Sequence, residues 1–207
     1  MVHVLIVDDQ RTGRYVLEDC VANMDGYMVV RSIENAAMAE LYCERGQTDL
    51  ILMDVCTAHG ESGLEAAAKI KQLYPCIKII IVTSMPEYSF IEKAKKAGSD
   101  SFWYKDVGCE ALSHVIKRTM SGESVYPECT PVLNIGIAKS VEFTPREMEV
   151  LRELVNGSTY KEISEVLGMS ENTLKTHIKR LLSKTGYKST LKLAVDVVDK
   201  KLVLPGF

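Results

Sequence analysis

The chain has 207 residues, of which 46% are hydrophobic and 26% charged, and its formal net charge is −3. This length suits one large domain or two small ones, and the composition is ordinary for a soluble globular protein. No apolar run is long enough to cross a membrane, no signal peptide is visible, and the six cysteines lack metal-site spacing. We therefore expect a cytoplasmic protein with free thiols and no membrane contact.

Strand-like and helix-like segments alternate five times within residues 1–120. The predicted strands are short apolar runs, and each is followed by a stretch with apolar residues at helical spacing. Strands are expected at residues 2–7, 28–32, 49–54, 77–83 and 101–104, and helices at 11–24, 36–45, 63–74, 87–97 and 109–120. Five such units with short connections predict an α/β fold with a doubly wound, five-stranded parallel sheet.

Polar residues follow the C-terminal ends of four of these strands. Asp8 and Asp9 follow the first strand, Asp54 ends the third, Thr83 ends the fourth and Lys105 follows the fifth. The C-terminal ends of parallel strands meet at one edge of the sheet, where α/β proteins bind their ligands. The sequence therefore predicts a site with three carboxylates, a hydroxyl group and an ammonium group.

The chemistry of this site follows from its charges. Closely spaced carboxylates repel one another unless a cation neutralises them, and a set of oxygen ligands favours Mg²⁺. Beside such an ion, Asp54 can attack a phosphoryl group and form an aspartyl phosphate. The ion and Lys105 would then neutralise the transferring oxygens, and Thr83 would donate a hydrogen bond to one of them.

These polar residues resemble the signature set of the receiver domain of two-component response regulators. The matching residues are Asp8, Asp9, Asp54, Thr83 and Lys105, with Arg14 at a further position usual in that family. The resemblance covers residues 1–121 and implies a flavodoxin-like receiver. It also implies that Asp54 accepts the phosphate and that Thr83 and Phe102 form the switch pair that reports phosphorylation.

The same resemblance implies a Mg²⁺ site. Asp9, Asp54 and the backbone carbonyl of Cys56 would bind the ion directly, and Asp8 would hold it through water. All of these ligand atoms are oxygens, which Mg²⁺ prefers.

The sequence departs from the receiver pattern after the phosphate acceptor. The family has Asp-x-x-Met-Pro and then a glycine, whereas here Thr57 and Ala58 replace Met-Pro and the glycine, Gly63, comes one residue later. A loop that lacks proline is less restricted in its backbone. We therefore expect the carbonyl of Cys56 to be held less firmly than in the family.

Residues 122–141 are predicted to be a linker between a receiver domain at 1–121 and a second domain at 142–207. The segment has no sustained hydrophobic period and contains two glycines and two prolines. Such a composition is typical of a tether.

Helical signals resume at Phe143. A capping box at 144–147, with proline at the first helical position, opens one helix, and Thr159, Ser170 and Thr190 mark the starts of three more. A short glycine-containing turn separates the second and third helices. This order predicts a small all-α, four-helix domain of the helix-turn-helix kind.

The third of these helices carries the candidate DNA-binding residues. Residues 170–192 contain six Lys or Arg residues and one acidic residue, which favours contact with a polyanion. Four residues on one side of the helix are candidates for base contacts: Lys175, Thr176, Lys179 and Arg180. Four others are candidates for phosphate contacts: Ser170, Asn172, Thr173 and Lys184.

Residues 142–203 closely resemble the LuxR-type DNA-binding domain, with Phe143-Thr-Pro-Arg-Glu147, Gly157 and Ser170-Glu-Asn-Thr-Leu-Lys-Thr-His-Ile178 as the matching motifs. Together with the receiver, they make the chain resemble a NarL/FixJ-class response regulator. The resemblance implies a non-enzymatic transcription regulator that a sensor histidine kinase phosphorylates at Asp54. Its implied partners are double-stranded DNA with inverted-repeat sites, a second copy of itself after phosphorylation, and RNA polymerase as a further candidate.

An apolar stripe on the last predicted helix suits packing on a second copy. It consists of Leu191, Ala194, Val195 and Val198.

Two alternatives stay open at the level of the sequence. The altered loop after Asp54 leaves room for a regulator that binds DNA independently of phosphorylation. A Mg²⁺-dependent phosphohydrolase would also use an aspartyl nucleophile, but it would need a second carboxylate close to the nucleophile. Val55 and Cys56 offer none.

Overall fold

The computed structural model describes residues 1–44, 46–105 and 111–203. The first two residues of the helix predicted at 109–120 lie outside the described residues. The chain divides into two compact units, Met1–Thr130 and Pro131–Phe207. Among the described residues, no helix has both the length and the apolar character needed to span a membrane.

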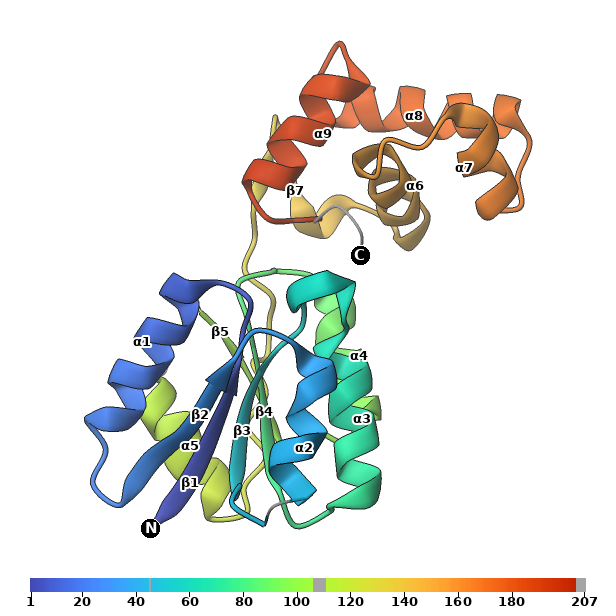
Figure 1. Cartoon of the computed structure of the whole chain (residues 1–207). Helices are drawn as coiled ribbons and strands as arrows, with labels where there is room; N and C mark the ends of the chain where they lie inside the picture. The colour runs from blue at the N-terminus through green and yellow to red at the C-terminus, as the bar shows by residue number, and fades with distance from the viewer. Residues whose placement is uncertain (45, 106–110, 204–207) are drawn as a thin grey trace. The chain divides into compact units, whose positions relative to one another are not determined.

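The first unit is a doubly wound parallel sheet, as the sequence predicted (Figure 1). Its strand order is β2-β1-β3-β4-β5, and every neighbouring pair is parallel. The strands are β1 (Val2–Val7), β2 (Tyr27–Ile33), β3 (Leu50–Asp54), β4 (Lys78–Thr83) and β5 (Ser101–Tyr104). The helices are α1 (Arg11–Ala22), α2 (Ala39–Glu44), α3 (Gly63–Leu73), α4 (Tyr88–Lys96) and α5 (Leu112–Met120), with short 3₁₀ turns η1 (Ala36–Met38) and η2 (Ala58–Gly60).

The helices cover both faces of the sheet. α1 and α5 lie on one face, and α2, α3 and α4 lie on the other (Figure 1). Because both faces are covered, the central strands are continuous apolar runs, and all five residues of β3 are buried.

The strand register brings the predicted site residues to one edge. Val7 of β1 pairs with Met53 of β3, so the residues that follow them, Asp8 and Asp54, leave the sheet side by side. Thr83 pairs with Tyr104, which places the end of β4 next to the end of β5.

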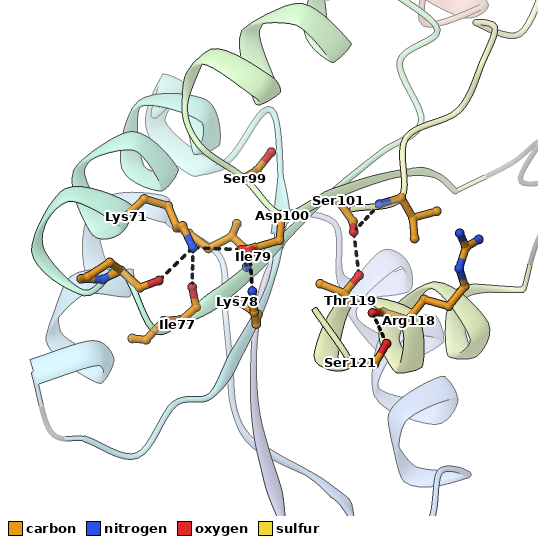
Figure 2. A network of polar contacts seen from close by, with 12 residues as sticks. Lys71, Ile77, Lys78, Ile79, Ser99, Asp100, Ser101, Arg118, Thr119 and Ser121 are labelled. Atoms are coloured by element: carbon orange, nitrogen blue, oxygen red, sulfur yellow. Dashed lines mark hydrogen bonds and ion pairs between the residues drawn. The ribbon is translucent and has the colours of Figure 1, made fainter. Parts of the chain in front are cut away.

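A polar network joins the N-terminal ends of β4 and β5, at the edge of the sheet away from the predicted site (Figure 2). The carboxylate of Asp100 accepts hydrogen bonds from Lys78 Nζ at 2.8 Å, from the Ile79 amide at 2.9 Å and from Lys71 Nζ at 3.0 Å. Burial alone would raise the pKa of Asp100, but these hydrogen bonds and ion pairs together lower it. The network therefore fixes the start of β5 against α3 and β4.

The segment after α5 packs along the outer edge of β5, and we call residues 123–130 the β5 strap. The Phe102 amide donates to the Val125 carbonyl at 2.8 Å, and the Val125 amide donates to Ser101 Oγ at 3.0 Å. Tyr126 donates its hydroxyl hydrogen to the Ser99 carbonyl at 2.6 Å. The sequence predicted a linker from residue 122, whereas the structure has this segment packed on the first unit.

The second unit contains α6 (Pro145–Val155), α7 (Tyr160–Val166), α8 (Glu171–Thr185) and α9 (Thr190–Asp199), which are the predicted helices. Capping boxes open α6 and α7. A short hairpin that the sequence did not predict precedes them: β6 (Asn134–Ile135) and β7 (Ala138–Lys139), followed by the 3₁₀ turn η3 (Ser140–Glu142). Ile135 and Ala138 of the hairpin are buried in the core of this unit, so this part of the predicted linker is also folded.

Candidate functional site

An acidic pocket lies at the C-terminal edge of the sheet. Asp8, Asp9 and Asp54 each offer a carboxylate oxygen, and the three oxygens lie within 4.8 Å of one another. Lys105 Nζ lies 2.8 Å from Asp8 Oδ2 and 2.6 Å from Asp54 Oδ2. The structure thus brings together the three predicted carboxylates and the predicted ammonium group.

Burial governs the electrostatics of this pocket. Asp8 is fully buried and Asp54 is only 5% exposed. Burial raises the pKa of Asp54 to about 6, with Lys105 opposing the shift and Asp8 adding to it. Burial and the neighbouring Asp8 also raise the pKa of Asp9. Burial would lower the pKa of Lys105, but the two carboxylates it contacts raise it, so Lys105 stays protonated at neutral pH.

This donor set fits Mg²⁺. Of the three clustered carboxylates, Lys105 contacts those of Asp8 and Asp54, so among the described residues the negative charges outnumber the ammonium group that contacts them, and a divalent cation can offset the excess. The side chain of Cys56 is buried, and burial raises the pKa of its thiol to about 12. The thiol is therefore not ionised at neutral pH, which leaves the backbone carbonyl as the ligand that Cys56 can offer.

Two glycines let the backbone approach the pocket aspartates closely, one at the Asp8 carboxylate and the other at the Asp54 backbone. A Cβ atom on Gly13 would lie 2.2 Å from Asp8 Oδ2, and one on Gly63 would lie 1.8 Å from the Asp54 carbonyl oxygen. A side chain at position 63 would therefore clash with the backbone of Asp54, so this position needs a glycine. Sequence reasoning did not single out Gly13, whose only signal is a glycine within the first turns of a predicted helix.

The extra residue of the loop between β3 and α3 is taken up by a left-handed turn. His59 has φ 64° and the next residue, Gly60, has φ 75°. A left-handed conformation is easy for glycine but unfavourable for histidine. His59 is exposed, and the group of metal-ligating side chains found among the described residues does not include it.

Both residues of the predicted switch pair are buried. The Met85 amide donates to Thr83 Oγ1 at 3.1 Å, which ties the hydroxyl to the loop after β4. The ring of Phe102 packs edge-on against Tyr104, with ring centroids 4.9 Å apart. The Phe102 amide is the group that donates to the β5 strap.

In the second unit, α8 has one buried and one exposed side. Leu174, Ile178 and Leu181 are buried in the core. The four candidate base-contact residues are exposed: Lys175, Thr176, Lys179 and Arg180. Ser170, Asn172 and Thr173 are exposed at the start of the helix, where Ser170 Oγ accepts a hydrogen bond from the Thr173 amide at 3.2 Å.

Lys184, the fourth candidate for a phosphate contact, has partners within the second unit. Its Nζ lies 2.6 Å from Glu147 Oε2 and donates to the Glu142 carbonyl at 2.9 Å, and it also lies 5.5 Å from the centre of the Phe143 ring. These contacts tie α8 to the start of α6. The DNA-phosphate contact expected of Lys184 stays a prediction, and without DNA its ammonium group is held by partners within the unit.

Comparisons with known proteins agree with both halves of the molecule. The model of the response regulator receiver domain matches residues 4–117, and the model of bacterial regulatory proteins of the LuxR family matches residues 141–197. The response regulator protein VraR of Staphylococcus aureus (strain Mu3 / ATCC 700698) is 30% identical over 207 residues, covering 98% of this chain and 99% of that protein.

Solved structures share the fold. RcsB from Salmonella enterica serovar Typhimurium, bound to promoter rprA in the presence of the phosphomimetic BeF₃⁻, has a TM-score of 0.58 at 19% identity, covering 95% of this chain and 98% of that one. A LuxR-family two-component response regulator from Aurantimonas sp. SI85-9A1 has a TM-score of 0.55 at 26% identity, covering 60% of this chain and 89% of that one.

Proposed function

Because the chain belongs to the family of response regulators that join a receiver domain to a LuxR-type DNA-binding domain, we propose that phosphate on Asp54 controls how it binds DNA. The observation that carries this proposal is the acidic pocket, in which Lys105 contacts both Asp8 and Asp54. The family is not enzymatic, so the phosphohydrolase alternative is set aside.

The acidic pocket is suited to phosphoryl transfer from a sensor histidine kinase. The Asp54 carboxylate would attack the phosphorus atom of the kinase phosphohistidine, so that a P–O bond forms while the P–N bond breaks. Mg²⁺ bound by Asp9, Asp54 and the Cys56 carbonyl, with Asp8 holding it through water, would supply positive charge to the phosphoryl oxygens.

The protein's own polar groups would act on the phosphoryl oxygens as well. Lys105 already lies against Asp54 and stays protonated, so it can neutralise a phosphoryl oxygen without a change of charge state. The hydroxyl of Thr83 would then leave the Met85 amide and donate to the phosphate. We expect Phe102 to report this change as the second member of the switch pair.

We assign α8 as the helix that enters the major groove of DNA. Its exposed Lys175, Thr176, Lys179 and Arg180 form one surface on the side opposite the buried core residues. Lys and Arg can bind guanine O6 and N7, and the methyl group of Thr can contact a thymine methyl. Ser170, Asn172 and Thr173 at the helix start would contact phosphates, which set register.

Dimerisation would link phosphorylation to DNA binding. Leu191 and Val195 of α9 are 71% and 60% exposed, whereas Leu193 and Val197 face the core. The exposed pair lies one helical turn apart and suits packing on a second copy at an inverted-repeat site. Two linked domains gain affinity because the second contact becomes effectively intramolecular. The proposed activity belongs in the cytoplasm, with RNA polymerase as a further candidate partner.

The phosphate acceptor is tested with Asp54→Asn in the full chain. With Mg²⁺ and a small phosphodonor, the wild type should take up acid-labile phosphate and the variant should take up none. Phosphorylated wild type should also bind selected genomic DNA fragments on the order of 100-fold more tightly, as measured by titration. Label that persists on the variant would refute the assignment. Equal DNA affinity with and without phosphate would favour the phosphorylation-independent regulator.

The reading helix is tested with Lys179→Ala, with Lys188→Ala as the control because Lys188 is exposed beyond the end of α8. Losing a base contact should cost about 1–3 kcal/mol of discrimination at one base position. Selection of bound DNA from a random pool should show relaxed preference at that position for Lys179→Ala only. An unchanged selected motif would show that α8 is not the reading helix in the form assigned here.

A further inference from the structure

Thr57 holds the loop between β3 and α3 by its side chain. It is 3% exposed and occupies the position where the receiver pattern has methionine. Its hydroxyl donates to the Glu61 carbonyl at 2.8 Å and accepts from the Ala36 amide at 3.0 Å. The first hydrogen bond closes the loop on itself, and the second ties it to the segment that follows β2.

The same segment connects the loop to the acidic pocket. The Ala58 amide donates to the Glu34 carbonyl at 2.9 Å, and the Glu34 carboxylate accepts from Arg14 Nη2 at 2.7 Å. Arg14 Nη1 in turn donates to the carbonyls of Asp8 at 2.7 Å and Asp9 at 3.2 Å. A continuous set of hydrogen bonds therefore runs from the loop to the backbone of two pocket carboxylates.

The loop needs such restraint for two reasons. It lacks the proline that limits the backbone in the family pattern, and it contains His59 in a left-handed conformation. Strained residues of this kind persist only where the surrounding structure holds them. The hydrogen bonds of Thr57 and Ala58 restrain the loop in this way. The loop is therefore more firmly held than we expected from the absence of proline.

We propose that Thr57 is a positioning residue for phosphorylation: it fixes the loop so that the Cys56 carbonyl is presented to Mg²⁺. Thr57 itself touches none of the reacting groups. The inference rests on the proposed phosphorylation of Asp54. In the family pattern Met-Pro restrains the loop, and here the Thr57 hydroxyl and its two backbone partners take over that restraint.

Three substitutions separate the hydroxyl from the shape of the side chain. Thr57→Val keeps the shape and removes both hydrogen bonds, Thr57→Ser keeps both, and Thr57→Cys weakens both. Mg²⁺ is titrated against Trp103 fluorescence in the full chain. We expect the Mg²⁺ affinity of Thr57→Val to fall about tenfold, which is the effect typical of losing a group that orients a metal ligand. The affinity of Thr57→Cys should fall less, and that of Thr57→Ser should stay within about twofold of wild type.

A second readout distinguishes positioning from general stability. With saturating Mg²⁺ the phosphorylation rate of Thr57→Val should recover toward wild type, whereas a globally damaged fold would not recover. The matched control is Asn35→Ala, because Asn35 Oδ1 accepts from the Ala37 amide at 2.7 Å beside this segment and does not bond to the loop. Its Mg²⁺ affinity should match the wild type.

The outcomes are separable. If Thr57→Val binds Mg²⁺ as wild type does, the inference is overturned while phosphorylation of Asp54 stands. If Thr57→Val does not fold, equal Mg²⁺ affinity of Thr57→Cys and Thr57→Ser overturns it in the same way. A wild-type chain that neither binds Mg²⁺ nor takes up phosphate overturns the proposed function itself, and the inference with it.

Discussion

Asp8 and Asp54 are buried side by side against one ammonium group, that of Lys105. Burial in a low-dielectric site disfavours the ionised form of Asp54, and the neighbouring Asp8 adds to this effect while Lys105 opposes it. The pKa of Asp54 is raised to about 6 because ionising this buried carboxyl group costs free energy. The pocket is therefore less stable in its ionised, metal-free form than a neutral pocket of the same shape would be.

Asp54→Asn should accordingly stabilise the metal-free protein at neutral pH. Because the pKa of Asp54 is raised from 3.8 to about 6, the folded state holds the proton more tightly than the unfolded chain, and stability falls as pH rises from about 4 to about 6. Asparagine does not ionise, so the variant should gain about 1–3 kcal/mol at pH about 7.5.

Urea unfolding without Mg²⁺ measures the difference between the two proteins at each pH. The advantage of Asp54→Asn should disappear near pH about 4, where the aspartate is protonated in the folded state. An advantage that is the same at both pH values would show that packing, and not charge, is responsible.

Single residues were predictable where a local pattern marked them. Asp54 and Thr83 end apolar strands and Lys105 follows one, and that position alone predicts a shared edge. Gly13 and Thr57 were not predictable in their roles, because a glycine pressed on Asp8 and a hydroxyl bonded to Ala36 depend on tertiary contacts that no local pattern encodes.

At the scale of elements, one feature of α8 was predictable from the local sequence pattern and another depends on tertiary contacts. The spacing of Leu174, Ile178 and Leu181 predicted the buried side, and the structure confirms it. The role of Lys184 was not predictable, because its partner Glu147 lies at the start of α6 and is distant in sequence. The hairpin of β6 and β7 escaped prediction because strands of two residues are too short to show a period.

Lys184→Met should weaken the second unit without changing how DNA binding responds to salt. Burial would raise the pKa of Glu147, but hydrogen bonds from Lys184 and Thr144 lower it, so the variant leaves a buried carboxylate without its main partner. The expected loss is about 1–3 kcal/mol in the free energy of unfolding.

The control is Lys188→Ala, which removes an exposed charge of the same sign. Thermal unfolding and DNA titrations at several salt concentrations measure both properties. A flatter salt dependence in Lys184→Met, at unchanged stability, would instead indicate a released phosphate contact.

At the scale of the whole molecule, the sequence predicted two folded units joined by a tether at 122–141. Alternating patterns identified the units because each strand and helix carries its own period. The tether is in fact folded at both ends: residues up to Thr130 pack on the first unit, and Ile135 and Ala138 pack in the second. Those contacts are made by single residues, such as Tyr126 with Ser99, and leave no periodic signal.

The β5 strap also decides where the receiver can be cut. β5 is an edge strand, and the strap occupies its outer side through Phe102 and Val125. A fragment of residues 1–121 would bare this edge, and a bare strand edge is a template for pairing with another copy. It should self-associate in sedimentation experiments, while a fragment of residues 1–130 should remain monomeric. Equal masses for both would contradict this. The match to the receiver family ends at residue 117. A receiver fragment cut at that boundary would lack the β5 strap, and we expect it to aggregate.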